Sequence, residues 1–269
     1  MKKLYWLALA LASPTVLIMA CKQGNQPTIK NGKATLLPEG PAWGALYQQR
    51  AGEYKALCYQ AYNIATLRLE QYVKRPSNLP KAIITDIDET VLDNSPYFVD
   101  RAKQGLTYSD SSWIAWTAQL KCDTLPGAAH FLKRAKELGV AVYYVTNRFA
   151  PERLATLENL KKFDLPDTDD AHLFVMGDDG SSKEGRRMNI TKDHNVILFL
   201  GDNLGDFNKE FDERNPQIRS AKVGVNANSF GEHFIVFPNV MYGSWEDRLY
   251  KKGDTTNDQK NNRLNNLLK

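Results

Sequence analysis

Two carboxylates separated by one residue, Asp86 and Asp88, follow directly on the apolar run 82–85. Residues i and i+2 of an extended chain point the same way, so the two carboxylates are expected to lie close together. Like charges that close repel, which raises the pKa of one carboxylate unless a cation lies between them or one keeps its proton. One carboxylate can then act as a nucleophile while the protonated one gives its proton to a leaving alcohol. Taken alone, however, the pair fits a solvated acidic turn better.

A second pair of carboxylates, Asp202 and Asp206, follows the apolar run 196–200. Asp202 can reach a divalent cation shared with Asp86, and oxygen ligands with few carboxylates are what Mg²⁺ prefers. Asp206, four residues on, suits a place beside these ligands, where it would hold a metal-bound water or a lysine. The two pairs together predict a magnesium site.

Two further elements suit a phosphate group. Thr146 and Asn147, after the run 140–145, offer a hydroxyl, an amide and backbone N–H groups near the start of a helix. Lys183, after the run 173–176, can supply the positive charge that a transferring phosphoryl group needs. Each is weak by itself, and an isolated lysine is usually a solvated surface residue. Together, the four motifs follow four predicted strands and supply a nucleophile, phosphate ligands, a positive charge and a metal site. This combination is far more specific than any one of the motifs alone.

The elements that must position these residues alternate between strand and helix. The predicted strands are Ala82–Thr85, Val140–Val145, Leu173–Met176 and Val196–Leu200, and the predicted helices between them are 128–138 and 152–162. This alternation predicts an α/β fold, a Rossmann-like, mostly parallel sheet with helices on both faces. Ligands of such sheets bind at the carboxyl ends of the strands. The Tyr- and Trp-rich segment 95–126, poor in strand signal, is expected to form a small helical cap over that edge.

The chain divides into five predicted regions. They are a signal peptide (1–20), a lipidated N-terminus and tether (21–41), a helical segment (42–79), the α/β core with its cap insertion (80–250) and a polar tail (251–269) with a short helix. The helical segment is predicted because apolar side chains recur at three- and four-residue spacing from Trp43 to Ala65. That spacing fits one long amphipathic helix or two joined ones.

The N-terminus has the order of a bacterial secretory signal, because Lys2 and Lys3 precede the apolar run 4–20. The run ends at Cys21 in a pattern that resembles the lipobox of bacterial lipoproteins, in which the cysteine is acylated and becomes the mature N-terminus. Lys22 after it favours the outer membrane, so we expect a protein anchored to that membrane by lipid. The alternatives are an ordinary secreted protein with Cys21 unmodified, or a retained anchor helix.

Composition and charge exclude several classes of protein. With 269 residues, 42% of them hydrophobic, the chain can bury a sizeable core and is neither disordered nor fibrous. A net charge of +4 without long basic runs gives no sign of binding to a nucleic-acid polymer. The four histidines are scattered singly, and no Cys-x-x-Cys spacing suggests zinc. Cys58 and Cys122 fit either a disulfide or two buried free thiols.

The motifs resemble the haloacid dehalogenase (HAD) superfamily and, within it, the class C (DDDD) bacterial acid phosphatases typified by lipoprotein e. The resemblance rests on Ile84–Tyr97 with its DIDET sequence and on Ile197–Phe207 with its GDNL sequence. It extends over about Trp43–Tyr250. Thr85 departs from the pattern, since the family usually has an aliphatic residue there, and this departure bears on packing more than on chemistry.

The resemblance implies a Mg²⁺-dependent phosphomonoesterase. Asp86 would attack phosphorus in line and form an aspartyl-phosphate, and Asp88 would protonate the leaving oxygen and later activate water. Mg²⁺ would be held by Asp86, the backbone carbonyl of Asp88, Asp202 and waters. Asp206 would hold the ligands around the metal, and Lys183, in place. The phosphate oxygens would be held by Thr146, Asn147 and Lys183. Because the leaving group needs a protonated Asp88, activity is expected to favour mildly acidic pH.

The resemblance also implies the substrates. Relatives use aromatic side chains near the equivalents of Trp113 and Tyr242 to sandwich a nucleobase or aryl group. Small phosphomonoesters, namely 5′-nucleotides and aryl phosphates, are therefore the expected substrates. Trp116 and Trp245 are expected to pack the core of the cap instead. A homodimer is also implied.

Two other interpretations remain open. A surface lipoprotein that binds haem or a nucleotide without catalysis would be expected to lack the nucleophile, whereas Asp86 is present with its partners. A phosphotransferase of the same superfamily, which passes the phosphoryl group to an acceptor alcohol, would differ from a phosphatase in the acceptor that it uses.

Overall fold

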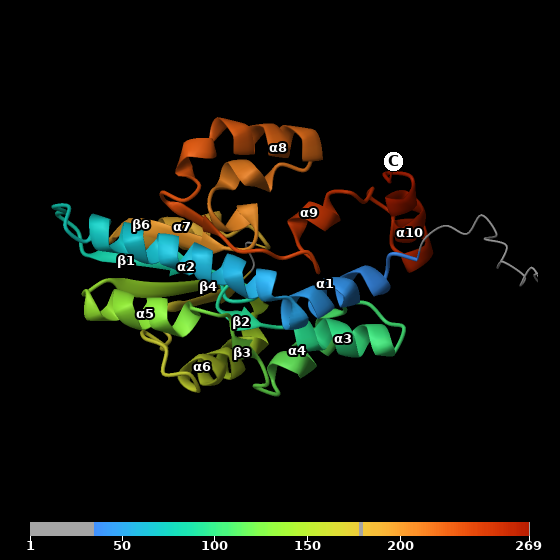
Figure 1. The fold of residues 1–269 in the computed structure, drawn as a ribbon, viewed down its shortest axis with the longest axis horizontal. Helices are drawn as coiled ribbons and strands as arrows, with labels where there is room; N and C mark the ends of the chain where they lie inside the picture. Colours follow the sequence, from blue (N-terminus) through green and yellow to red (C-terminus); the bar gives the residue numbers. More distant parts are fainter. Residues whose placement is uncertain (1–34, 178–179, 269) are drawn as a thin grey trace, which may run out of the picture. The chain divides into compact units, whose positions relative to one another are not determined.

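The computed structural model describes residues 35–177 and 180–268. Within these residues, five strands form a parallel sheet in the order β5-β4-β1-β6-β7 (Figure 1). The strands are β1 Lys81–Thr85, β4 Ala141–Phe149, β5 Leu173–Met176, β6 Asn195–Gly201 and β7 Phe234–Val236. The carboxyl ends of β4, β1 and β6 therefore lie side by side at one edge of the sheet. The predicted α/β fold with a parallel sheet is confirmed.

Apolar side chains of β1 alternate between the two faces of the sheet. Ile83 belongs to the large core cluster, together with side chains of α2 (Gly52–Tyr72) and α5 (Ala128–Glu137). Ile84, one residue on, belongs to a second cluster with α7 (Glu184–Thr191). Because successive strand residues point to opposite faces, helices cover both faces of the sheet, as predicted.

The N-terminal helical segment consists of two joined helices, α1 (Glu39–Arg50) and α2, separated by the extended residue Ala51. The buried face of α2 recurs at three- and four-residue spacing and carries Tyr54, Cys58, Ala61, Tyr62, Ala65, Leu69 and Tyr72. From this face the hydroxyl of Tyr62 donates to the carbonyl of Thr90, 2.6 Å away, in the turn after β1. The helix thus supports the turn that carries the first pair of carboxylates.

The segment 95–126 contains α3 (Ser95–Lys103) and α4 (Asp110–Thr117). Its base is closed by an antiparallel ribbon of β2 (Leu92–Asp93) and β3 (Asp123–Thr124). The sequence did not predict this ribbon, because strands of two residues have no measurable periodicity. Helix α1 packs against α3 (Figure 1), so the N-terminal helices and the cap support each other.

The remaining helices surround the sheet and its carboxyl edge. They are α6 (Arg153–Lys161), α8 (Pro216–Val225), α9 (Ser244–Asp247) and α10 (Asn257–Asn265), with 3₁₀ turns at 150–152, 204–206, 209–212 and 227–229. Strand β4 runs to Phe149, four residues beyond its predicted end, so Thr146 and Asn147 belong to the strand itself. The short edge strand β7 was not predicted.

The predicted signal peptide and Cys21 lie outside the described residues. In the part of the chain that the structure describes, no helix has the length and apolar character needed to cross a membrane. Cys58 and Cys122 are both buried free thiols, so of the two alternatives for these cysteines the structure has the unpaired one.

Candidate active site

Asp86 follows the last residue of β1 and lines a cavity of about 470 Å³. Its backbone N–H donates to the carbonyl of Leu200 at 2.9 Å, which keeps it against β6. Its Oδ1 accepts a hydrogen bond from Nζ of Lys183 at 2.5 Å. Lys183 immediately precedes α7 and is 5% exposed, so it is not a solvated surface lysine. The end of β1 and the start of α7 therefore meet in a buried ion pair.

The loop after β6 brings Asp202 and Asp206 to the same place. The 3₁₀ turn at 204–206 folds the chain back over Gly201, where an added Cβ would lie 2.3 Å from Oδ2 of Asp206. Oδ1 of Asp206 accepts from Lys183 at 2.6 Å, and Oδ2 accepts from the backbone N–H of Asn203 at 2.9 Å. A glycine at the end of β6 thus makes room for a carboxylate that holds the lysine.

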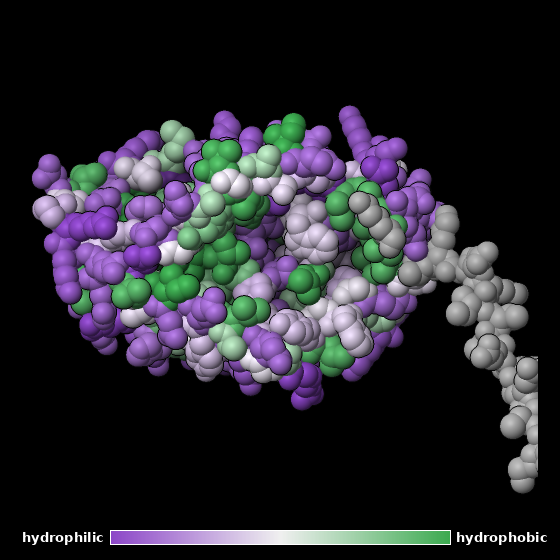
Figure 2. Space-filling view, turned by 45° about the horizontal axis from the view of Figure 1, so that its top comes forward, coloured by the Kyte–Doolittle hydropathy of each residue, from purple (hydrophilic) through white to green (hydrophobic). Residues whose placement is uncertain are grey.

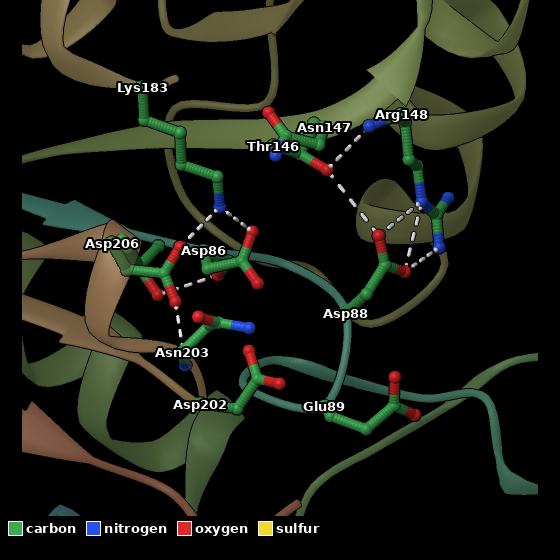
Figure 3. Close-up of polar contacts among 12 residues, drawn as sticks. Asp86, Asp88, Glu89, Thr146, Asn147, Arg148, Lys183, Asp202, Asn203 and Asp206 are labelled. Atoms are coloured by element: carbon green, nitrogen blue, oxygen red, sulfur yellow. Dashed lines mark hydrogen bonds and ion pairs between the residues drawn. The ribbon is translucent and has the colours of Figure 1, made fainter. Parts of the chain in front are cut away.

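The carboxylates of Asp86, Asp202 and Asp206 form a cluster in which one oxygen of each lies within 4.8 Å of the others. Figure 3 shows them converging, with Lys183 on one side. Three carboxylates that face one ammonium leave two negative charges uncompensated, and every donor is an oxygen. Both properties suit a hard divalent cation. Asp206, predicted to lie beside the ligands, contacts Lys183 and also belongs to the oxygen cluster.

The close packing of these charges shifts their pKa values. Burial raises the pKa of Asp86 to about 7; Lys183 opposes this rise, whereas Asp206 and Asp88 add to it. Burial also raises the pKa of Asp202 well above its usual range, and Asp206 again adds to the shift. Burial lowers the pKa of Lys183, but its two carboxylate partners outweigh burial and leave it raised. The main cause of the raised pKa of Asp86 is thus loss of water on burial, and the expected repulsion between Asp86 and Asp88 contributes less.

The carboxylate of Asp88 turns away from this cluster (Figure 3). Nε of Arg148 donates to both of its oxygens at 3.1 Å, and Nη2 donates to Oδ1 at 2.7 Å. Nδ2 of Asn94 also donates to Oδ1, at 2.9 Å. The sequence predicted a repelling pair of carboxylates, but in the structure each has its own cation, Lys183 for Asp86 and Arg148 for Asp88.

Thr146 and Asn147, the predicted phosphate ligands, lie in different surroundings. Thr146 is buried, and its hydroxyl accepts from the backbone N–H of Arg148 at 3.1 Å. Asn147 lines the cavity, where its Nδ2 donates to the carbonyl of Ser181 at 2.9 Å and its Oδ1 accepts from Arg186 at 2.7 Å. The Asn147 side chain therefore holds the segment that leads into α7, and phosphate binding by both residues stays a prediction.

Aromatic side chains form one wall of the cavity, to which Phe98, Trp113 and Tyr242 contribute. Tyr242 stacks on Phe98, with ring centroids 4.9 Å apart and planes inclined by 20°. The centroids of Trp113 and Tyr242 are 6.3 Å apart, and their planes are inclined by 60°. The two predicted sandwich partners therefore both face the cavity, but as adjoining surfaces rather than as parallel plates.

Of the two rings assigned to packing, Trp116 is buried in the cap and donates to Oδ1 of Asn94 at 3.0 Å. The prediction for Trp245 was wrong, because this ring is 43% exposed. It is held at the surface by a hydrogen bond from Nε1 to the carbonyl of Tyr242, 3.1 Å away.

Three buried residues of the site had no role assigned from the sequence: Glu89, Asn94 and Arg148. Glu89 has a φ of 58°, which residues other than glycine rarely adopt, and its Oε1 accepts from the backbone N–H of Asn94 at 2.7 Å. Its other oxygen accepts a hydrogen bond from the hydroxyl of Tyr242. Burial raises the pKa of Glu89 well above its usual range, and Asp88 adds to this rise. The available signal was the presence of these polar side chains beside the ends of predicted strands or shortly after them.

Comparisons with known proteins agree with this geometry. A model of the HAD superfamily, subfamily IIIB (acid phosphatase), matches residues 18–245. The class C acid phosphatase from Bacillus anthracis is similar in structure, with a TM-score of 0.83 and 35% identity over 88% of this chain and 99% of that one. The structure of the class C acid phosphatase from Bacillus anthracis with tungstate bound has a TM-score of 0.83 and 36% identity, over 87% and 98% of the two chains.

The raised pKa of Asp86 predicts how metal binding depends on pH. A carboxyl group that binds its proton more tightly when folded contributes stability below its unfolded pKa of about 4, and this stability is lost as pH rises through about 7. A divalent cation replaces the proton, so Mg²⁺ should raise the melting temperature more at pH 8 than at pH 5.

The measurement is thermal unfolding with EDTA and with Mg²⁺ at both pH values. Asp86→Asn is the matched variant, because it removes this titration and should make the Mg²⁺-induced shift smaller and less dependent on pH. An equal Mg²⁺-induced shift at pH 5 and pH 8 in the unaltered protein would contradict the prediction.

Proposed function

Because this chain belongs to subfamily IIIB of the HAD superfamily and is an acid phosphatase of class C, we propose that it hydrolyses small phosphomonoesters with Mg²⁺ through an aspartyl-phosphate on Asp86. The observation that carries this proposal is the meeting of Asp86, Asp202, Asp206 and Lys183 at one edge of the sheet, beside the cavity. A nucleophilic carboxylate, a cation site and a buried ammonium within contact of one another are what transfer of a phosphoryl group requires.

Each residue of the site has a separate role in the proposed reaction. Asp86 attacks phosphorus, and Lys183, held between Asp86 and Asp206, offers its ammonium to a phosphoryl oxygen. Asp88 gives a proton to the leaving oxygen and later takes one from the attacking water. Mg²⁺, held by Asp86, the backbone carbonyl of Asp88 and Asp202, would neutralise charge on the non-bridging oxygens.

Thr146 and Asn147 are proposed to hold the same phosphoryl oxygens from the end of β4. The relative from Bacillus anthracis has been solved with tungstate, which is a tetrahedral oxyanion like phosphate. Its structural similarity to this chain supports an oxyanion site in this chain as well.

The proposed substrates are 5′-nucleotides and aryl phosphates. A cavity of about 470 Å³ falls within the range of small-molecule sites, and Phe98, Trp113 and Tyr242 give it an aromatic wall. A ring of the leaving group can lie against this wall while the phosphate reaches Asp86.

Loss of the nucleophile tests the proposed reaction. Asp86→Asn should lower kcat for p-nitrophenyl phosphate on the order of 10⁴-fold or more, because the amide cannot form the acyl phosphate. Asp164→Asn is the matched control, since this carboxylate is 91% exposed and should be replaceable without effect. Activity that survived in Asp86→Asn would refute the mechanism. Phosphate release measured with and without an acceptor alcohol separates hydrolysis from phosphotransfer.

The aromatic wall makes a prediction about KM. Tyr242→Ala should raise KM for a nucleoside 5′-monophosphate roughly tenfold, since one stacked base contributes about 1–3 kcal/mol. Glycerol phosphate, which has no ring, should be much less affected. Tyr242→Phe is the control, because it keeps the ring and removes the hydroxyl that donates to Glu89. An unchanged KM for the nucleotide in Tyr242→Ala would remove Tyr242 from substrate binding.

We further propose that Cys21 carries the lipid that anchors the enzyme to the outer membrane. The support is the order of residues 1–21, where a charged start and an apolar run end at a cysteine. Cys21→Ser should abolish labelling with radioactive palmitate and move the protein from the membrane fraction to the soluble fraction. Unchanged labelling, or membrane association without the cysteine, would contradict the lipid anchor.

A further inference from the structure

The acid–base residue Asp88 is fixed by a second buried cation, Arg148. The guanidinium of Arg148 presents Nε and Nη2 to the carboxylate at 2.7–3.1 Å, and Asn94 adds a third donor at 2.9 Å. The Arg148 side chain is 0% exposed and that of Asp88 is 12% exposed. Buried donors therefore hold the Asp88 carboxylate, while Asp88 still lines the cavity proposed to bind the substrate.

The guanidinium is itself held in place. Nη1 of Arg148 donates to the hydroxyl of Thr156 at 3.2 Å, and that hydroxyl donates to the backbone carbonyl of Glu152 at 2.8 Å. The carboxylate of Glu152 is buried and accepts from the backbone N–H of Phe149 at 2.7 Å and from Thr117 at 2.8 Å. Since Thr117 belongs to α4, the position of Arg148 is tied to the cap as well as to β4.

Asn94, which donates to Asp88 as does the hydroxyl of Thr146 at 3.4 Å, contacts the cap directly. Its Oδ1 accepts from Nε1 of Trp116 at 3.0 Å and from the thiol of Cys122 at 3.0 Å. Side chains of the cap thus contact Asn94 directly and are linked to Arg148 through Glu152 and Thr156. Loss of water offsets much of the attraction within a buried ion pair, so stabilisation of the fold does not by itself account for this pair.

We propose that Arg148 is a positioning residue for the acid–base step, holding the carboxyl group of Asp88 where it meets the leaving oxygen. This inference rests on the proposed function. As the bond between phosphorus and the leaving oxygen breaks and the bond to Asp86 forms, the proton of Asp88 passes to the leaving oxygen and completes the alcohol. In the second half, Asp88 takes a proton from the water that attacks phosphorus, and the bond to Asp86 breaks.

The fixed position matters because general acid catalysis depends on the distance and direction of the proton donor. A leaving group that departs easily as an anion, such as nitrophenolate, needs this help least, whereas an alkoxide needs it most.

The test is the dependence of kcat/KM on the leaving group, measured for nitrophenyl, phenyl and alkyl phosphates. This ratio reports the steps up to the first departure of the leaving group and so excludes later hydrolysis of the aspartyl-phosphate. In Arg148→Met, kcat/KM should fall at least about 100-fold for alkyl phosphates and less than about tenfold for nitrophenyl phosphate. The reason is that general acid catalysis contributes a factor of roughly 10²–10⁴ to the rate. Arg148→Lys should fall between, because it keeps the charge without the planar fork.

Two further variants keep the test decisive. Thr156→Val keeps Arg148 but removes the hydroxyl that accepts from its Nη1. It should therefore make kcat/KM depend more steeply on the leaving group, by a smaller factor than Arg148→Met. If Arg148→Met fails to fold, Thr156→Val provides the test. Arg187→Met is the matched control, since this buried arginine donates to Gly205 and Glu184 instead. Any loss that it causes should be equal for all of the esters.

An equal loss for all esters in both Arg148→Met and Thr156→Val would overturn the inference and leave Arg148 with a purely structural role. Failure of the proposed function has a different signature, because Asp86→Asn would then remain active whatever the Arg148 variants do.

Discussion

The attraction of Lys183 for two buried carboxylates, Asp86 and Asp206, is the interaction on which the rest of the site depends. Without this ammonium, three acidic groups would face one another away from water, which is strongly unfavourable. With it, the cluster is left with the excess negative charge that attracts a divalent cation. The same arrangement thus explains why the carboxylates can be buried and why they are ready to bind metal and phosphate.

Backbone geometry makes this concentration of charge possible. Parallel strands end at the same edge of the sheet, so residues after β1 and β6 meet although more than a hundred positions separate them. Gly201 leaves the space that Asp206 occupies, and Glu89 adopts a left-handed backbone in the turn after β1. This backbone directs Glu89 toward Tyr242, so one hydrogen bond joins the turn after β1 to the aromatic wall of the cavity.

The cap has a second part in this arrangement besides forming a wall of the cavity. Through Trp116 it contacts Asn94, and through Thr117 it contacts Glu152, which is linked to Arg148 by Thr156. Asp86, by contrast, is held by Lys183 and by the backbone of β6. The proposed nucleophile and the proposed acid are therefore positioned by different parts of the chain. Changes in the cap can alter proton transfer to the leaving group without moving the nucleophile.

The sequence by itself determined the α/β fold and the edge of the sheet where the site lies, because strand periodicity is local and parallel strands must end together. It also identified Asp86, Asp202, Asp206 and Lys183 as neighbours, since each follows a predicted strand. Only the tertiary structure decided that Asp88 pairs with Arg148, that the rings of Trp113 and Tyr242 are inclined, and that the two cysteines described are unpaired. These features depend on side-chain orientation and on burial by segments 60 or more residues apart, such as Arg148 on Asp88, and no local pattern encodes that packing.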